Sequence, residues 1–260
     1  MLDMHPPILV SRTPRRRRWR GSLATAATTA AGLLAATLAG AAPKAPPGVA
    51  QDCPARATIL VEHFIGADCE ACWQVAPPGL GAMPVTGKEW SLDWIAPAGD
   101  DAAMSAGALP EAAERLGRVN ADLPARLASA PAAFDSMTAL SRPPAGRRFY
   151  VHSSLPYRGY FGVQMHATGV WPAGSTGWLA LVEQIEPGVR GTQIPRRLVR
   201  VVVGPMRLPA GPGARNAVAP LYGLRWPQNA HPENLVATAW IEDAAGRITQ
   251  ITSDRCVDPK

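Results

Sequence analysis

Residues 57 to 72 decide how the folded part of this chain begins. They read Ala57-Thr58-Ile59-Leu60-Val61-Glu62-His63-Phe64-Ile65-Gly66 and, after two more residues, Cys69-Glu70-Ala71-Cys72. The first part is a short apolar run, rich in branched and aromatic residues, that ends at a glycine, and this pattern predicts a buried strand. The second part is a CxxC pair. We therefore expect two cysteines three positions apart at the point where this strand ends.

A CxxC pair at the end of a strand is the smallest unit that can carry out thiol–disulfide exchange. One cysteine attacks as a thiolate, and the other must lie close enough to resolve the mixed disulfide. If Cys72 lies in the first turn of a helix, backbone N–H groups and the helix dipole would stabilise a thiolate at Cys69. The sequence therefore predicts Cys69 as the nucleophile and Cys72 as the resolving thiol.

Residues 1–50 have the parts of an export signal. An arginine cluster over residues 15–20 is followed by an uncharged run of small and apolar residues over 21–42, and small residues suit cleavage after Ala41 or after Ala50. The run contains few leucines, so it is a poor permanent membrane span, although a retained anchor is the alternative. This leader predicts a periplasmic or secreted protein with no stable membrane span after cleavage.

The net charge of +6 is a property of this leader. Residues 1–50 hold seven of the 26 basic residues and one of the 20 acidic residues, which leaves 19 of each sign on the remainder. A nucleic-acid-binding protein needs a surplus of lysine and arginine on its folded surface. We therefore expect no nucleic-acid partner.

The other two of the four cysteines lie near the two ends of the mature chain. An even cysteine count in an exported protein favours disulfides. With Cys69 and Cys72 taken as one unit, Cys53 and Cys256 are left to form a structural disulfide that joins the termini. The alternative is that one of them is a free thiol in a frayed terminus.

The pattern of the mature chain changes near residue 145. Before this point we expect a strand over residues 90–95, a helix over 102–116 and an interrupted helical stretch over 121–140. After it, apolar and polar residues alternate, which predicts short strands separated by turns and a sandwich-like or antiparallel arrangement. The expected strands cover residues 161–167, 178–185, 198–203, 235–241 and 248–253. The sequence thus divides into 1–50 (signal peptide and Pro-rich linker), 51–145 (the domain with the CxxC pair) and 146–260 (a β-rich domain).

The stretch from Val61-Glu62-His63-Phe64 to Cys72 resembles the central strand and active-site turn of thioredoxins. It is similar to a bacterial family of exported thioredoxin-like proteins of unknown function, and residues 197–205 and 234–250 resemble the β-rich region appended to some of its members. The resemblance implies an α+β fold, with a thioredoxin-like α/β domain followed by a β-sandwich-like domain. It also implies a buried acid beneath the disulfide, for which Glu62 by chemistry and His63 by spacing are the candidates.

These observations lead to two functional hypotheses. The first is an exported thiol–disulfide oxidoreductase that uses Cys69 and Cys72, is assisted by Glu62 or His63, acts on protein thiols or disulfides and needs no cofactor. The second is a non-catalytic envelope protein in which both cysteine pairs are structural. A zinc site at Cys69, Cys72 and His63 is a third option, but zinc sites usually combine two close ligand pairs. We therefore expect no metal.

Overall fold

The described residues lie within the unit that covers residues 47–260, and the predicted export signal lies outside the described part of the chain. The computed structural model describes residues 57–75, 89–99, 101–120, 133–142, 146–210, 216–218 and 221–255.

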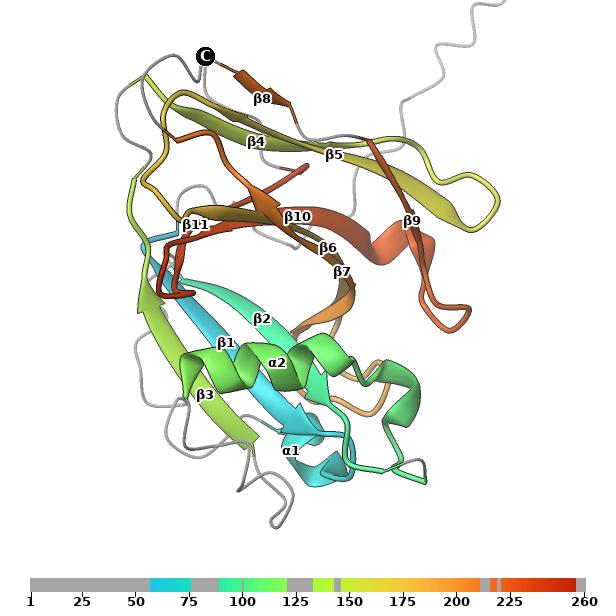
Figure 1. The fold of residues 1–260 in the computed structure, drawn as a ribbon. Helices are drawn as coiled ribbons and strands as arrows, with labels where there is room; N and C mark the ends of the chain where they lie inside the picture. The colour runs from blue at the N-terminus through green and yellow to red at the C-terminus, as the bar shows by residue number, and fades with distance from the viewer. Residues whose placement is uncertain are drawn as a thin grey trace, which may run out of the picture. The chain divides into compact units, whose positions relative to one another are not determined.

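A seven-stranded mixed sheet forms the centre of the unit (Figure 1). Its strand order is β11-β10-β6-β7-β2-β1-β3. β1 is parallel to β2 and antiparallel to β3, while β2 meets β7 in parallel at the pair Asp93 and Leu198. β7, β6, β10 and β11 follow as antiparallel neighbours. The strands are β1 (Ile59–Gly66), β2 (Glu89–Ala96), β3 (Ala133–Ala139), β6 (Thr176–Ile185), β7 (Arg196–Arg207), β10 (Leu235–Glu242) and β11 (Ile248–Ser253).

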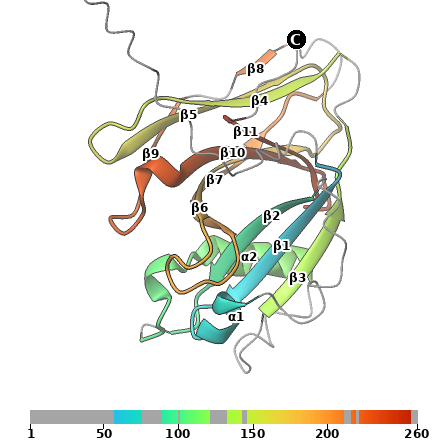
Figure 2. The ribbon, with the colours of Figure 1, turned by 180° about the vertical axis from the view of Figure 1, so that it is seen from behind.

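A four-stranded sheet packs on one face of this central sheet, as Figure 2 shows from behind. In β5 every second side chain is buried, as the alternation in the sequence predicts. These side chains meet the inward-facing residues of β6 and β10, including Leu179, Leu181, Ala237 and Ala239, in one apolar cluster. The strands of the smaller sheet are β4 (Arg148–Ser153), β5 (Tyr160–Thr168), β8 (Asn216–Val218) and β9 (Tyr222–Arg225).

Helix α2 (Pro110–Val119) covers the opposite face of the central sheet. It begins at Pro110, whose missing N–H costs nothing at the first helical position. Its buried residue Leu116 packs in one cluster with Trp94, Trp178 and Trp240 of β2, β6 and β10. The remaining helices are short: α1 (Glu70–Gln74), η2 (Ser105–Gly107) and η3 (Pro232–Asn234).

The predicted fold class is wrong. The described residues are mostly β-sheet, and they do not form a thioredoxin-like α/β domain followed by a separate sandwich-like domain. The reason is that β6, β7, β10 and β11 join the same sheet as β1, β2 and β3. Alternation identifies a segment as a strand but does not say with which strand it pairs. The expected boundary near residue 145 falls between β3 and β4.

Most expected strands are confirmed, and the helices differ. β2, β6, β7, β10 and β11 each cover the strand expected there. The helix expected over 102–116 begins later, at Pro110. Residues 133–139, expected to be helical, form β3, because pairing with β1 along the whole strand outweighs the helix propensity of alanine and methionine, which is small in free energy per residue. Residues 121–132 lie outside the described residues.

Candidate active site

The CxxC pair lies in a short helix directly after β1. β1 ends at Gly66, a turn follows, and α1 begins after Cys69. The N–H of Cys69 donates to the Gly66 carbonyl (2.9 Å), and the N–H of Ala67 donates to the Ala96 carbonyl at the end of β2 (2.9 Å). Cys69 and Cys72 form a disulfide with their Cα atoms 5.3 Å apart. The expected pairing is confirmed, at the edge where the parallel strands β1 and β2 end.

The two cysteines differ in exposure. Cys69 is only 7% exposed and packs in a small apolar cluster with Ile65 and Trp73. Cys72 is half-buried at the border of the same cluster. Glu70, between the two cysteines, is exposed. Cys72 is therefore the more accessible half of the disulfide.

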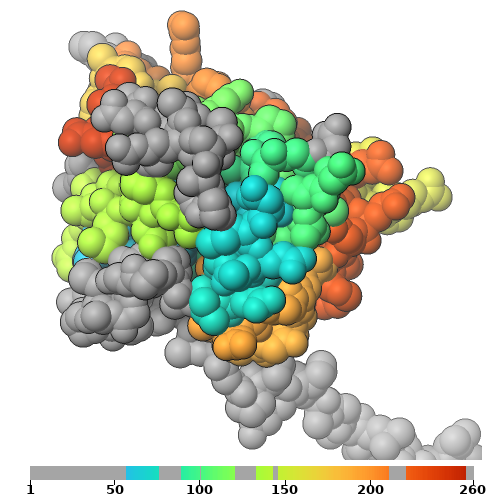
Figure 3. Space-filling model, turned by 90° about the horizontal axis from the view of Figure 1, so that it is seen from below, coloured from blue at the N-terminus to red at the C-terminus, as the bar shows by residue number. Residues whose placement is uncertain are grey.

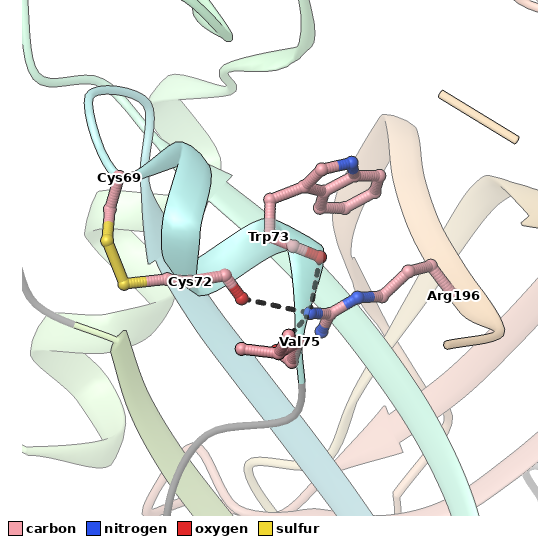
Figure 4. The surroundings of a disulfide bond; sticks show 5 residues. All are labelled: Cys69, Cys72, Trp73, Val75 and Arg196. Atoms are coloured by element: carbon pink, nitrogen blue, oxygen red, sulfur yellow. Dashed lines mark hydrogen bonds between the residues drawn. A yellow bond between two sulfur atoms is a disulfide. The ribbon is translucent and has the colours of Figure 1, made fainter. Parts of the chain in front are cut away.

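A buried arginine holds the far end of α1 (Figure 4). Nη2 of Arg196, in β7, donates to the carbonyls of Cys72 (2.9 Å), Trp73 (2.8 Å) and Val75 (3.0 Å). Nη1 of the same side chain donates to Oδ1 of Asp93 in β2 (2.9 Å), and both side chains are 1% exposed. The last carbonyls of a helix have no partner within the helix. Arg196 supplies these partners, so contacts that do not involve the disulfide hold α1 in place.

The loop between β6 and β7 adds further contacts to α1. Nε1 of Trp73 donates to the Arg190 carbonyl (2.8 Å), and the N–H of Gln193 donates to the Gln74 carbonyl (2.8 Å). The guanidinium carbon of Arg196 lies 5.2 Å from the centre of the Trp73 ring, a distance typical of a cation–π contact. The carboxyl-terminal half of α1 is thus bound to β7 and to the loop before it.

Glu62 lies in a buried ion-pair network. It is fully buried, and its two oxygens accept hydrogen bonds from Nε (2.9 Å) and Nη2 (2.6 Å) of Arg115 in α2. Nη1 of Arg115 also donates to Glu242 in β10 (3.1 Å). Burial alone would lower the pKa of Arg115, but the hydrogen bond and charge of Glu62, with the charge of Glu242, raise it above its usual value. Glu62 therefore links β1 to α2 and, through Arg115, to β10.

His63 lies on the opposite face of β1, because successive side chains of a strand alternate. Its Nδ1 is 2.6 Å from Oδ1 of Asp135, which pairs with His63 in the neighbouring strand β3. Glu62 and His63, the two residues expected to assist the cysteines, thus contact Arg115 and Asp135 respectively. Their role in catalysis stays a prediction.

Asp93 and Arg196 were not predicted from the sequence to belong to this site. One signal was present, since Asp93 is the one charged residue in the run Trp90–Ile95. An acid inside a buried strand needs a charged or hydrogen-bonding partner. The partner stands 103 residues further on, and no local pattern points to it.

Three other expectations concern the disulfide between Cys53 and Cys256, a metal site and a membrane span. Cys53 and Cys256 lie outside the described residues, so their disulfide stays a prediction. Within the ranges that the structure describes, no group of three or more histidine, cysteine, aspartate or glutamate side chains is arranged to hold a metal ion. In the same ranges, no helix has the length and apolar character needed to cross a membrane.

Comparison with known proteins yields one structural neighbour to report. No protein-family model matches the sequence, and no curated protein matches it. Among solved structures, HBP35 of Porphyromonas gingivalis is similar at a TM-score of 0.45 and 8% sequence identity, over 76% of this chain and 74% of that chain.

Proposed function

We propose that the protein is a thiol–disulfide oxidoreductase that reacts through Cys69 and Cys72. The observation that carries this proposal is that Arg196 and Trp73 anchor α1 independently of the disulfide. A disulfide that closes a four-residue loop contributes only about 2 kcal/mol in the chain-entropy model. The bond therefore adds little to a segment that is already held, whereas reversible exchange requires a segment that stays in place when the bond opens.

The difference in exposure suggests which sulfur meets the substrate. The sequence predicts Cys69 as the attacking sulfur. In the structure, however, Cys69 is buried, whereas Cys72 is half-buried and therefore more accessible. Access limits the rate of thiol–disulfide exchange. We assign the sulfur that bonds to the substrate to Cys72, and the internal, resolving sulfur to Cys69.

The oxidised form reacts with a substrate dithiol in two displacements. A substrate thiolate attacks Sγ of Cys72, a new S–S bond forms, and the Cys69–Cys72 bond breaks with Cys69 leaving as a thiolate. The second substrate thiolate then attacks the substrate sulfur of this mixed disulfide and releases Cys72 as a thiolate. The substrate loses two electrons and, as its thiols ionise, two protons to water, while the protein gains the two electrons and the thiolates of Cys69 and Cys72 can take up two protons from water.

Arg196 serves this chemistry as a positioning residue. It binds the carbonyl of Cys72 itself, so a contact that does not involve the sulfur atoms holds the backbone of the more accessible cysteine. Glu62 and His63 are engaged with Arg115 and Asp135, which favours structural roles for both. The expected substrates are protein thiols or disulfides met after export, in the periplasm or outside the cell, as the leader predicts.

Single-cysteine variants test the proposal. Cys69→Ser leaves Cys72 as the one thiol of the pair, and Cys72→Ser leaves Cys69. Each full-length variant is incubated with oxidised glutathione, and mass spectrometry with peptide mapping follows the adduct at each cysteine. We expect the Cys72 thiol to form the adduct about tenfold faster than the Cys69 thiol, since it is the more accessible. The alternative of a non-catalytic protein with structural disulfides predicts that neither thiol reacts faster than one in the unfolded chain.

A further inference from the structure

A pocket opens beside Trp73 of α1. Its volume is ≈ 340 Å³, and five separate segments supply its walls: α1, the segment around η2, the β6–β7 loop with β7, the end of β2, and the loop before η3. Figure 3 shows the first three of these segments meeting at the surface, coloured cyan, green and orange. Ligand sites typically have volumes of roughly 300 to 1,000 Å³, so this pocket suits a small ligand.

One part of the pocket is apolar. Trp73, Ile95, Met104 and Leu198 line it, and all four belong to the apolar cluster around Cys69. Trp73 is held by its hydrogen bond to the Arg190 carbonyl. This part is therefore suited to an apolar or aromatic group.

Two arginines line the other part. Arg200 is 3% exposed, and Arg190 reaches the same site from the β6–β7 loop. Both pair with a single buried acid, Glu183, at 2.9 Å from Nη2 of Arg190 and at 3.4 Å from Nε of Arg200. Two positive charges that line the pocket thus share one buried negative charge. Burial lowers the pKa of Arg200 although the charge of Glu183 opposes this shift, and the neighbouring charge of Arg190 lowers it further.

The hydrogen bonds of Arg200 also leave capacity for a ligand. Nη2 donates to Oδ1 of Asn229, and Nε, although it makes no hydrogen bond within the described residues, lies 3.4 Å from Oε2 of Glu183. Nη1 faces Gly107, where an added Cβ would lie 3.4 Å from it and 3.0 Å from Cδ1 of Ile95. Buried arginines are normally paired and hydrogen-bonded. Arg190 and Arg200 thus share Glu183 and together carry one positive charge more than this acid compensates.

We propose that this pocket binds a small monocarboxylate with an apolar or aromatic body. The carboxylate binds at Arg190 and Arg200, and the body lies against Trp73, Met104 and Leu198. Guanidinium groups match the planar carboxylate geometry. Glu70, at the rim, adds a negative charge that disfavours ligands with several negative charges. The proposal does not depend on the redox activity of the neighbouring disulfide.

A matched pair of probes tests the charge requirement. Hydrocinnamate and its neutral amide, hydrocinnamamide, have the same shape, and their binding to the oxidised full chain is measured by isothermal titration calorimetry. We expect hydrocinnamate to bind at least about tenfold more tightly than hydrocinnamamide, because only the carboxylate neutralises the positive charge of the two arginines. Equal binding of the two probes, or no binding of the acid, would overturn the proposal.

Variants locate the binding. Arg190→Gln and Arg200→Gln should each weaken the binding of hydrocinnamate by about tenfold or more and leave the binding of hydrocinnamamide unchanged. Arg158→Gln, in the exposed turn between β4 and β5, is the control and should change the binding of neither probe. Gly107→Val should weaken both probes, because its side chain would enter the pocket beside Ile95. If Arg200→Gln does not fold, Arg190→Gln and Gly107→Val still show whether the probe binds in this pocket. Acid binding that none of them weakens would place the site elsewhere and overturn the assignment.

The two proposals fail separately. Probe binding is measured without any thiol chemistry, so an inert disulfide with intact binding would remove only the oxidoreductase proposal. A reactive Cys72 without probe binding would remove only the pocket proposal.

Discussion

Replacing Arg196 by methionine removes the anchor of α1 and should strongly destabilise the protein. Methionine keeps an apolar stem of similar length but loses the donors to the carbonyls of Cys72, Trp73 and Val75. It also leaves Asp93, 1% exposed, without its ion-pair partner. Breaking a buried ion pair from one side typically costs about 3–5 kcal/mol. We expect the free energy of unfolding of Arg196→Met to fall by about this amount.

A second variant separates the two parts of this cost. Asp93→Asn combined with Arg196→Met removes the unpaired charge as well, so the remaining loss should reflect the helix carbonyls that have lost their donor. Leaving such groups unsatisfied costs about 1–3 kcal/mol. The double variant should therefore be more stable than Arg196→Met alone. Arg225→Met, an exposed arginine in β9, is the matched control and should lie within about 0.5 kcal/mol of the natural protein.

Equilibrium unfolding in urea of the oxidised full chain measures these differences. Hydrogen exchange of the α1 amides reports in parallel whether the helix is released. A loss below about 1 kcal/mol for Arg196→Met, with unchanged protection of α1, would refute the reasoning, because a buried and four-fold hydrogen-bonded guanidinium cannot then be what holds the helix.

Three further predictions concern stability. Replacing Cys69 and Cys72 together by serine should lower the free energy of unfolding by only about 2 kcal/mol, with α1 still protected in hydrogen exchange; loss of that protection would contradict the anchoring argument. Arg115→Leu leaves Glu62 buried without its partner and should cost about 3–5 kcal/mol in urea unfolding, whereas a near-neutral effect would show that the network contributes little. Burial raises the pKa of Asp254, against the opposing effect of its hydrogen bonds, so the natural protein should lose stability as the pH rises from the ordinary aspartate pKa through the raised one. Asp254→Asn should remove this loss, and parallel stability curves for the two proteins across that range would contradict the prediction.

The strands could be read from the sequence, but their pairing could not. β10 and β11 match their expected ranges closely, because short runs rich in apolar and β-branched residues are a local signal. The single parallel contact of Asp93 with Leu198, which joins β2 to β7, links residues over 100 positions apart. Local patterning contains no information about such a pairing, so two domains were expected where the described strands share one central sheet.

The site was predictable to a similar degree. The spacing of Cys69 and Cys72 was enough to predict their pairing and their place at the end of β1. Their relative exposure depends on how Trp73 packs against the β6–β7 loop. The anchoring by Arg196 depends in turn on the meeting of β2 and β7. Both are tertiary features, which explains why the sequence alone favoured Cys69 as the attacking sulfur, whereas the proposal from the structure assigns this role to Cys72.

The reduction potential of the Cys69–Cys72 disulfide tests the central claim most directly. It is obtained by equilibrating the full chain with buffers of defined thiol–disulfide ratio and measuring the reduced fraction of this pair by mass spectrometry. A bond that opens and closes during exchange should have a potential of roughly −120 to −270 mV, within the range of known oxidoreductases. A value below roughly −300 mV, typical of structural disulfides, would contradict the proposed function.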